Sequence, residues 1–181
     1  MRRYVVYGGS FDPIHVGHLS MLERAVAMGY TVLAVPAYRH AFGKRLSPFC
    51  HRLRMCELAL TATGLPPRAR VCGVERQLGE GNTAPVYTYN VLCCLRDKLG
   101  EAPYLLVGPD IAKEWERWYQ HRRIDQEFGR LCLPVVHPIH SSELRRRIRA
   151  GACRESLRPF LPEAVIDYIF THRLYRDAEP D

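Results

Sequence analysis

Lysine is scarce in this sequence, since Lys44, Lys98 and Lys113 are the only lysines among 26 basic residues. The seven cysteines form no CxxC pair, which argues against a zinc site or a disulfide framework. We therefore expect reduced, mostly buried thiols. No apolar run approaches the roughly 18 residues that a membrane span requires. The run from Tyr4 to Tyr7 is too short for a secretory signal. These absences predict a soluble, cytoplasmic protein without a membrane partner.

The composition is that of a folded chain. Hydrophobic residues make up 47% and charged residues 25% of 181 positions, which predicts one domain over residues 1–181 with a helical C-terminal part from about residue 141. The net charge of +7 indicates an anionic partner. The anionic partner could be nucleic acid, a membrane surface or a phosphorylated small molecule, and the net charge does not distinguish between them. Arginine suits phosphate oxygens, but its abundance can also follow from genome composition.

Short apolar runs alternate with amphipathic stretches along the chain. We expect strands at residues 4–8, 31–35, 70–74, 104–107 and 131–136, and helices at 16–28, 48–62, 86–99, 111–119, 142–150 and 163–170. This order predicts an α/β fold with a doubly wound parallel sheet. Ligands of such sheets bind beyond the carboxyl ends of the strands, where the strand order reverses. The loop after the first strand is therefore the first candidate site.

That loop, residues 8–18, reads GGSFDPIHVGH and opens a helix. Gly8 and Gly9 allow a close approach of the backbone to a ligand, and the free N–H groups of the helix start attract anions. His15 and His18 are three residues apart, so they lie on one side of the first turn and can donate to phosphate oxygens. Gly17 would leave this turn open to a bulky ligand.

Other interpretations of the loop have weaker support. The two histidines could be a metal pair or ordinary surface residues, but a zinc site needs more ligands and no third candidate lies nearby in the sequence. We therefore predict no metal site built from protein ligands. The Walker A pattern GxxxxGK[ST] and the dinucleotide pattern GxGxxG are both absent.

The loop resembles the HxGH signature of the adenylyltransferase superfamily, whose members move AMP from ATP to an acceptor. Residues 139–145, IHSSELR, resemble its second signature, ISSTxIR, with His140 in place of a serine and Ser142 in place of the threonine. An ordinary helix N-cap before a basic helix is the alternative for this segment. The resemblance implies a Rossmann-like nucleotidyltransferase fold. It also implies an ATP site made of Gly8, Gly9, Ser10, Phe11, His15, His18, Gly108, Asp110, Ser141, Ser142 and Arg145.

The middle of the chain is similar to the bacterial nicotinate mononucleotide adenylyltransferases. Residues 87–90, YTYN, resemble the SYTxDT stretch of that family, and residues 108–110, GPD, resemble its GxD turn. Trp118 and Tyr119 fall at its WY position. The resemblance implies that Trp118 stacks on the pyridine ring, while Thr88 and the Tyr119 backbone meet the carboxylate of nicotinate mononucleotide.

Two further features follow from this resemblance. Lys44 and Arg52 match basic positions of the family and become candidates for acceptor binding, Lys44 also for catalysis. A structural role is the alternative for Arg52. An indole face suits a cationic pyridinium. The alternative is that Trp115 and Trp118 lie on one helix face that packs into the core. Of the two, we expect Trp115 to be the buried one. The interval from Trp118 to Ser141 is short for the family, which indicates a compact variant.

The implied reaction is an in-line attack by the acceptor phosphate on the α-phosphorus of ATP, with release of pyrophosphate. His15, His18, Lys44 and Arg145 would stabilise the charge, and the cofactor would be Mg²⁺ carried by the ATP phosphates. We expect Asp12 to shape the loop. Asp110 is the better candidate for contact with the ligand or with metal-bound water.

Several alternatives remain open at this point. The acceptor could be nicotinamide mononucleotide or phosphopantetheine, or the chain could be a nucleotide sensor without turnover. The arginines at 145–147 and 149 could form a nucleic-acid patch, but on a helix they spread around the axis, so we predict a solvated helix and no nucleic-acid partner. The sequence does not decide between a monomer and a homo-oligomer.

Overall fold

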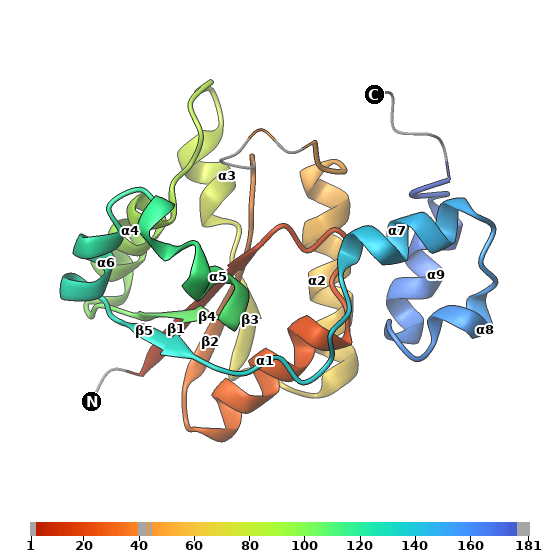
Figure 1. The fold of residues 1–181 in the computed structure, drawn as a ribbon, viewed down its shortest axis with the longest axis horizontal. Helices are drawn as coiled ribbons and strands as arrows, with labels where there is room; N and C mark the ends of the chain where they lie inside the picture. Colours follow the sequence, from red (N-terminus) through yellow and green to blue (C-terminus); the bar gives the residue numbers. More distant parts are fainter. Residues whose placement is uncertain (1–2, 40–42, 44, 177–181) are drawn as a thin grey trace.

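A five-stranded sheet, all of whose strand pairs are parallel, forms the centre of the computed structural model, which describes residues 3–39, 43 and 45–176 (Figure 1). The strands are β1 Tyr4–Gly9, β2 Thr31–Pro36, β3 Ala69–Val71, β4 Tyr104–Val107 and β5 Arg130–Cys132. Their order across the sheet is β3-β2-β1-β4-β5. The order reverses between β1 and β4, so the predicted doubly wound α/β architecture is confirmed.

The helices follow the strands in the expected alternation. They are α1 Val16–Ala27, α2 Phe49–Thr63, α3 Val74–Gly79, α4 Thr88–Leu99, α5 Pro109–Lys113, α6 His121–Glu127, α7 Ser141–Arg149, α8 Arg154–Leu157 and α9 Glu163–Thr171, with a short 3₁₀ helix, η1, at Trp115–Arg117. Gly64 after α2 and Gly100 after α4 adopt positive φ angles, a conformation that ends helices and favours glycine.

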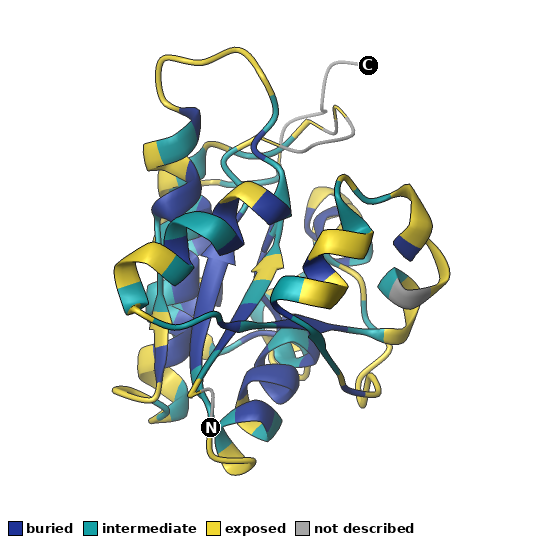
Figure 2. Cartoon of the chain, turned by 90° about the vertical axis from the view of Figure 1, so that its left-hand side faces the viewer, coloured by how far each residue is buried: buried dark blue, intermediate teal, exposed yellow. Residues whose placement is uncertain are grey.

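Successive strand residues enter two different hydrophobic clusters, because side chains alternate across a sheet. Val5 packs with α1, α2 and the C-terminal helices. Its neighbour Val6 packs with residues of α3, α4, η1 and α6. Figure 2 shows the resulting layers, with dark blue strands between helices that are buried on their inward sides. Burial on both faces explains why the central strands are continuous apolar runs.

The C-terminal helices α7, α8 and α9 gather at one end of the molecule, beside α2 (Figure 1). Leu144, Leu157 and Ile169 belong to the same hydrophobic cluster as α1 and α2. This shared cluster places the start of α7 next to the loop that follows β1.

Several predicted boundaries were wrong. The strand expected at 70–74 ends at Val71, and Val74 begins α3. The strand expected at 131–136 ends at Cys132, because Pro134 has no N–H for a ladder. The helix expected at 111–119 is broken into α5 and η1, and Trp118 has an extended backbone. The short helices α6 and α8 were not predicted.

The thiols also differ from the expectation. All seven cysteines lie in the described ranges and are free, but only Cys56 is buried. Cys50, Cys132 and Cys153 are exposed because they lie at the start of α2, on the edge strand β5 and before α8. The prediction of mostly buried thiols was therefore wrong. In the part of the chain that the structure describes, no helix has the length and apolar character of a membrane span.

Candidate active site

A cavity of about 1200 Å³ opens at the carboxyl ends of β1 and β4. Gly8 and Gly9 end β1, and Gly108 follows β4, and all three glycines line the cavity. These two strands are neighbours, and the strand order reverses between them. A cavity thus lies at the position where the sequence predicts the ligand site.

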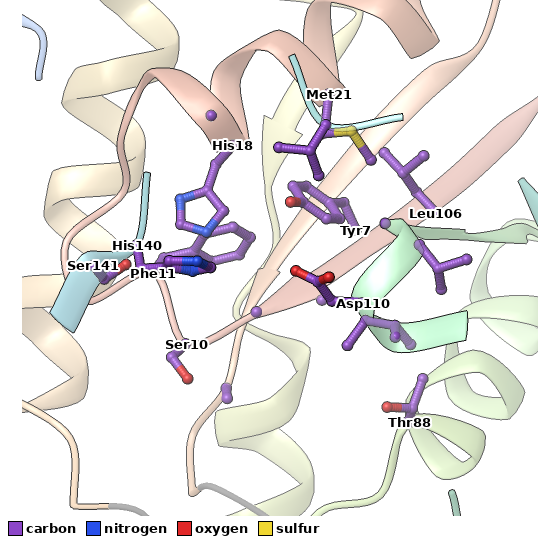
Figure 3. A pocket seen from close by; sticks show the side chains of 18 of the residues that line it. Tyr7, Ser10, Phe11, His18, Met21, Thr88, Leu106, Asp110, His140 and Ser141 are labelled. Carbon is purple, nitrogen blue, oxygen red and sulfur yellow. The ribbon is translucent and has the colours of Figure 1, made fainter. Parts of the chain in front are cut away.

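Most of the predicted site residues line this one cavity. They are Gly8, Gly9, Ser10, Phe11, His15, His18, Thr88, Gly108, Asp110, Trp118, Tyr119, Ser141, Ser142 and Arg145. Figure 3 shows His18, His140 and Ser141 on one side of it, with Asp110 and Thr88 on the other. Lys44 lies outside the described residues, so its roles stay predictions.

The histidine pair is built into the first turn of α1. His15 is the N-cap residue, and its Nδ1 accepts a hydrogen bond from the Gly17 N–H at 3.1 Å. The Nδ1 of His18 accepts from the His15 N–H at 3.3 Å. The two rings stack with their centroids 3.7 Å apart. The expectation that both side chains lie on one side of the turn is confirmed.

These hydrogen bonds decide where the imidazole protons are. A neutral imidazole whose Nδ1 accepts carries its proton on Nε2, so each ring keeps an Nε2–H donor. Burial, and secondarily the nearby His140, lower the pKa of His15 to about 4. Burial also lowers the pKa of His18 well below its usual value, with further contributions from His15 and His140. At neutral pH the pair therefore supplies two neutral donors that suit phosphate oxygens.

Gly17 lines the cavity, and packing also requires its lack of a side chain. A Cβ atom at this position would lie 2.9 Å from the carbonyl oxygen of His137 and 3.0 Å from the ring of His15. The hydrogen in place of a side chain thus lets the segment before α7 pack against the first turn of α1. This packing brings the two signature segments together.

Asp12 shapes the loop, as predicted. Its side chain is 1% exposed, and its carboxylate accepts from the Tyr175 hydroxyl at 2.7 Å and from the Ser47 N–H at 3.0 Å. Its carbonyl oxygen accepts from Arg145 Nη1 at 2.8 Å. The loop after β1 is therefore tied to α7 and to the C-terminal segment by a buried polar network.

Arg52 is not among the residues that line the cavity. The residue is 1% exposed, and its guanidinium donates to the carbonyl oxygens of Ser10 and Ser47, each at 2.8 Å. Through these contacts Arg52 stabilises the loop that follows β1. Its predicted role in acceptor binding stays a prediction, and the observed contacts favour the positioning of Ser10.

Aromatic side chains also line the cavity, namely Tyr87, Trp118 and Tyr119. Trp115 is 6% exposed and donates from its indole N–H to Asp125 at 2.8 Å, which confirms it as the core tryptophan. Trp118 is half-buried and lines the cavity, and Tyr119 stacks on Tyr87 with ring centroids 4.5 Å apart. Trp118 is thus available to a flat heteroaromatic ring.

The sequence analysis missed several cavity residues. Tyr7 and His140 lie beside or inside the two signatures, so closer attention to those motifs would have found them. Arg39, Glu75 and Arg117 also line the cavity, and no pattern in the sequence links them to it. Glu75 accepts from the Tyr38 N–H at 2.7 Å, and burial raises its pKa to about 7.

The carboxylates of the cavity fit a metal ion that arrives with a nucleotide. Magnesium sites of this kind use one or two carboxylates with phosphate oxygens and water. Asp110 is an exposed carboxylate at the cavity wall. Within the described ranges, no three histidine, cysteine, aspartate or glutamate side chains gather as a metal cage.

Comparisons with known proteins agree with this geometry. The family model described as cytidylyltransferase-like matches residues 6–147. A probable nicotinate-nucleotide adenylyltransferase of Anaeromyxobacter dehalogenans (strain 2CP-C) is 36% identical over 190 residues, covering 97% of both chains.

Two solved structures share the fold. One, from Vibrio parahaemolyticus, is assigned as a nicotinate-nucleotide adenylyltransferase and has a TM-score of 0.80 at 19% identity, covering 98% of both chains. The other is the Plasmodium falciparum nicotinic acid mononucleotide adenylyltransferase complexed with NaAD, with a TM-score of 0.76 at 18% identity, covering 97% of this chain and 98% of that one. Together with the family model and the Anaeromyxobacter relative, they show that the chain belongs to the cytidylyltransferase-like family and, within it, to the nicotinate-nucleotide adenylyltransferases.

Proposed function

We propose that this chain transfers the adenylyl group of ATP to nicotinate mononucleotide, giving nicotinate adenine dinucleotide and pyrophosphate. The observation that carries this proposal is the pair His15 and His18, whose Nδ1 atoms are occupied by backbone N–H groups so that two Nε2–H donors remain. They lie at the switch point of the sheet, in a cavity of about 1200 Å³. A typical small-molecule pocket measures roughly 300–1000 Å³, so this one has room for two nucleotides.

In the proposed reaction, an oxygen of the acceptor phosphate forms a bond to the α-phosphorus while the bond to the bridging oxygen of pyrophosphate breaks. The attacking phosphate is already an anion at neutral pH, so the protein needs no general base. Its contribution is positioning and charge stabilisation. The Nε2–H groups of His15 and His18 donate to the phosphate oxygens, and Arg145, one turn into α7, adds a positive charge at the cavity. Lys44 remains a predicted fourth contributor.

Mg²⁺ supplies charge neutralisation on the ATP phosphates when it is bound. Asp110 is the residue that we propose to hold it, directly or through water, because its carboxylate is exposed at the cavity wall. Glu75 also lines the cavity, but its carboxylate already accepts a hydrogen bond from the Tyr38 N–H. We therefore assign it no role in metal binding.

We propose that the acceptor binds beside the aromatic side chains that line the cavity, Tyr87, Trp118 and Tyr119. Trp118 would stack on the pyridinium ring, and Thr88 with the Tyr119 backbone would meet the carboxylate. The names of the curated relatives support nicotinate mononucleotide over the other acceptors.

Nucleic-acid binding has less support from the geometry. Arg145 is buried against the Asp12 carbonyl, while Arg146 and Arg147 both pair with Glu143. These arginines therefore do not form one basic face. The seven free thiols suit a reducing compartment, which supports the cytoplasm as the site of the reaction.

The deciding experiment measures pyrophosphate release from Mg-ATP with nicotinate mononucleotide, nicotinamide mononucleotide or phosphopantetheine in separate reactions. A strong preference for nicotinate mononucleotide would support the proposal. Release with only one of the other acceptors would keep the chemistry and replace the acceptor. No release with any acceptor, from protein that binds ATP, would favour a nucleotide sensor.

A further inference from the structure

The hydroxyl group of Tyr7 has no hydrogen-bond partner in the part of the chain that the structure describes. Tyr7 lies on β1, just before the two glycines that end the strand, and it lines the cavity. Among the described residues, every fully buried polar side-chain atom has a partner. The Tyr7 hydroxyl is therefore accessible from the cavity, where a ligand can bind it.

The Tyr7 ring is held in place by its neighbours. It packs against the hydrophobic cluster of α1 and α2. It meets the Phe11 ring edge to face with centroids 5.6 Å apart, and the His18 ring lies at 6.2 Å. Burial raises the pKa of Tyr7 above its ordinary value, so the hydroxyl stays protonated and can both donate and accept. The protein thus presents a neutral, oriented hydroxyl beside the histidine pair.

The sheet separates Tyr7 from the aromatic residues that we propose for the acceptor. Tyr7 and Val5 are two positions apart on β1, so they point to the same face, and both belong with the cluster of α1 and α2. Trp118 packs against the other cluster, together with Val6. Tyr7 therefore enters the cavity from the face opposite to Trp118. On that face, the ligand that remains in the proposed reaction is the adenylyl donor.

The cavity around Tyr7 is otherwise mainly apolar. Met21, Leu106 and Ile139 line it and pack in the same cluster. Figure 3 shows Met21 and Leu106 around Tyr7, with His18 on the side of the phosphate loop. Ligand pockets are typically apolar surfaces with a few polar groups that fix the orientation of the ligand. The Tyr7 hydroxyl is such a group, next to the histidine that donates to the phosphates in the proposed reaction.

We propose that the Tyr7 hydroxyl forms a hydrogen bond with the AMP moiety of ATP, the part that is transferred. The inference rests on the proposed function, since it takes ATP as the adenylyl donor. The partner atom is an oxygen of the ribose or of the α-phosphate, and the AMP moiety carries both. Because this moiety is present in substrate and product alike, Tyr7 would contribute to binding throughout the reaction and would not contact the leaving pyrophosphate.

Tyr7→Phe tests the proposal, because it removes the hydroxyl and keeps the ring. The protein loses no internal hydrogen bond, so the melting temperature should stay equal or rise. Titration calorimetry with Mg²⁺ and without acceptor should show the affinities for ATP and for AMP falling about fivefold, as for one neutral hydrogen bond. The affinity for pyrophosphate should not change. In steady-state assays the KM of ATP should rise by the same factor, with kcat unchanged within about twofold.

Two analogues identify the partner oxygen. 2′-Deoxy-ATP and 3′-deoxy-ATP each lack one ribose hydroxyl. If Tyr7→Phe weakens ATP but no longer weakens one of the analogues, the partner is the hydroxyl that this analogue lacks. If it weakens both analogues as much as ATP, the partner is the α-phosphate. Either result supports a contact with the AMP moiety.

The matched control is Tyr4→Phe, which removes a hydroxyl from the same strand at a position that does not line the cavity. It should leave all three affinities unchanged. Unchanged AMP binding by Tyr7→Phe would overturn the proposal. Equal weakening of pyrophosphate, or an equal effect of Tyr4→Phe, would also overturn it, because the effect would then not be specific to the AMP moiety or to Tyr7. If the wild-type protein bound ATP and AMP but released no pyrophosphate with any acceptor, the proposed function would fail while the assignment of Tyr7 would still be decided by AMP binding. If it bound neither nucleotide, both would fail.

Discussion

Acidification from pH 7 to pH 5 should destabilise the folded chain through His15. This side chain is 4% exposed, and burial together with His140 lowers its pKa from 6.5 to about 4. Between these two values the unfolded chain binds a proton that the folded chain excludes. Stability therefore rises with pH through this window and is lost as the pH falls below 6.5.

The size of the effect follows from the shift. Each unit of difference in pKa corresponds to about 1.4 kcal/mol. At pH 5 the unfolded imidazole is almost fully protonated and the folded one is still almost fully neutral. His15 should thus lower the free energy of unfolding by about 2 kcal/mol between pH 7 and pH 5.

His15→Asn is the variant that isolates this contribution. Asparagine is a good N-cap, and its side-chain oxygen can accept from the Gly17 N–H as the imidazole does. Urea unfolding followed by circular dichroism at pH 5, 6 and 7 measures the free energy of unfolding of both proteins. The wild type should lose about 2 kcal/mol more than the variant over this range. His18 is present in both proteins, and burial is the main cause of its lowered pKa while His15 adds a smaller part, so the difference between the two proteins reports mainly on His15.

The control is Gln126→Asn, which changes an exposed side chain of α6 that binds no proton. Its pH profile should follow that of the wild type. Parallel profiles for the wild type and His15→Asn would refute the reasoning, because they would show that the fold does not exclude the proton from His15.

Three further predictions concern the site and its supports. His18→Asn keeps an acceptor for the His15 N–H but loses the Nε2–H donor. We expect kcat to fall about 10²–10³-fold while the circular dichroism spectrum stays unchanged. A decrease in kcat of less than about threefold would show that His18 takes no part in the reaction. Trp118→Ala should raise the KM of the acceptor about tenfold and the KM of ATP less than about twofold in steady-state assays, whereas equal changes would indicate mere packing. Tyr175→Phe removes the hydroxyl that donates to the buried carboxylate of Asp12 and should cost about 2 kcal/mol in urea unfolding. Tyr168→Phe, whose hydroxyl contacts the His51 ring and no carboxylate, should cost under about 1 kcal/mol. Equal costs for the two tyrosines would contradict the role given to the Asp12 network.

Prediction from the sequence succeeded where the interactions are local. The spacing of His15 and His18 places both rings on one turn in any helix that begins there, so their pairing needed no tertiary information. The apolar runs of β1, β2 and β4 likewise indicated buried parallel strands. The break after Lys113 was missed, because the position of Trp115 depends on Asp125 ten residues further along the chain.

The sequence by itself determined the fold class, the loop after β1 and the two signature segments, because periodicity and helix-start preferences act over a few residues. Only the tertiary structure decided that Arg52 braces Ser10 and that Asp12 binds Tyr175, 163 positions away. It also decided that Glu75 joins the cavity and that His140 faces the α1 pair. Such contacts depend on how the sheet order and helix packing bring distant segments together, and no local pattern encodes that juxtaposition.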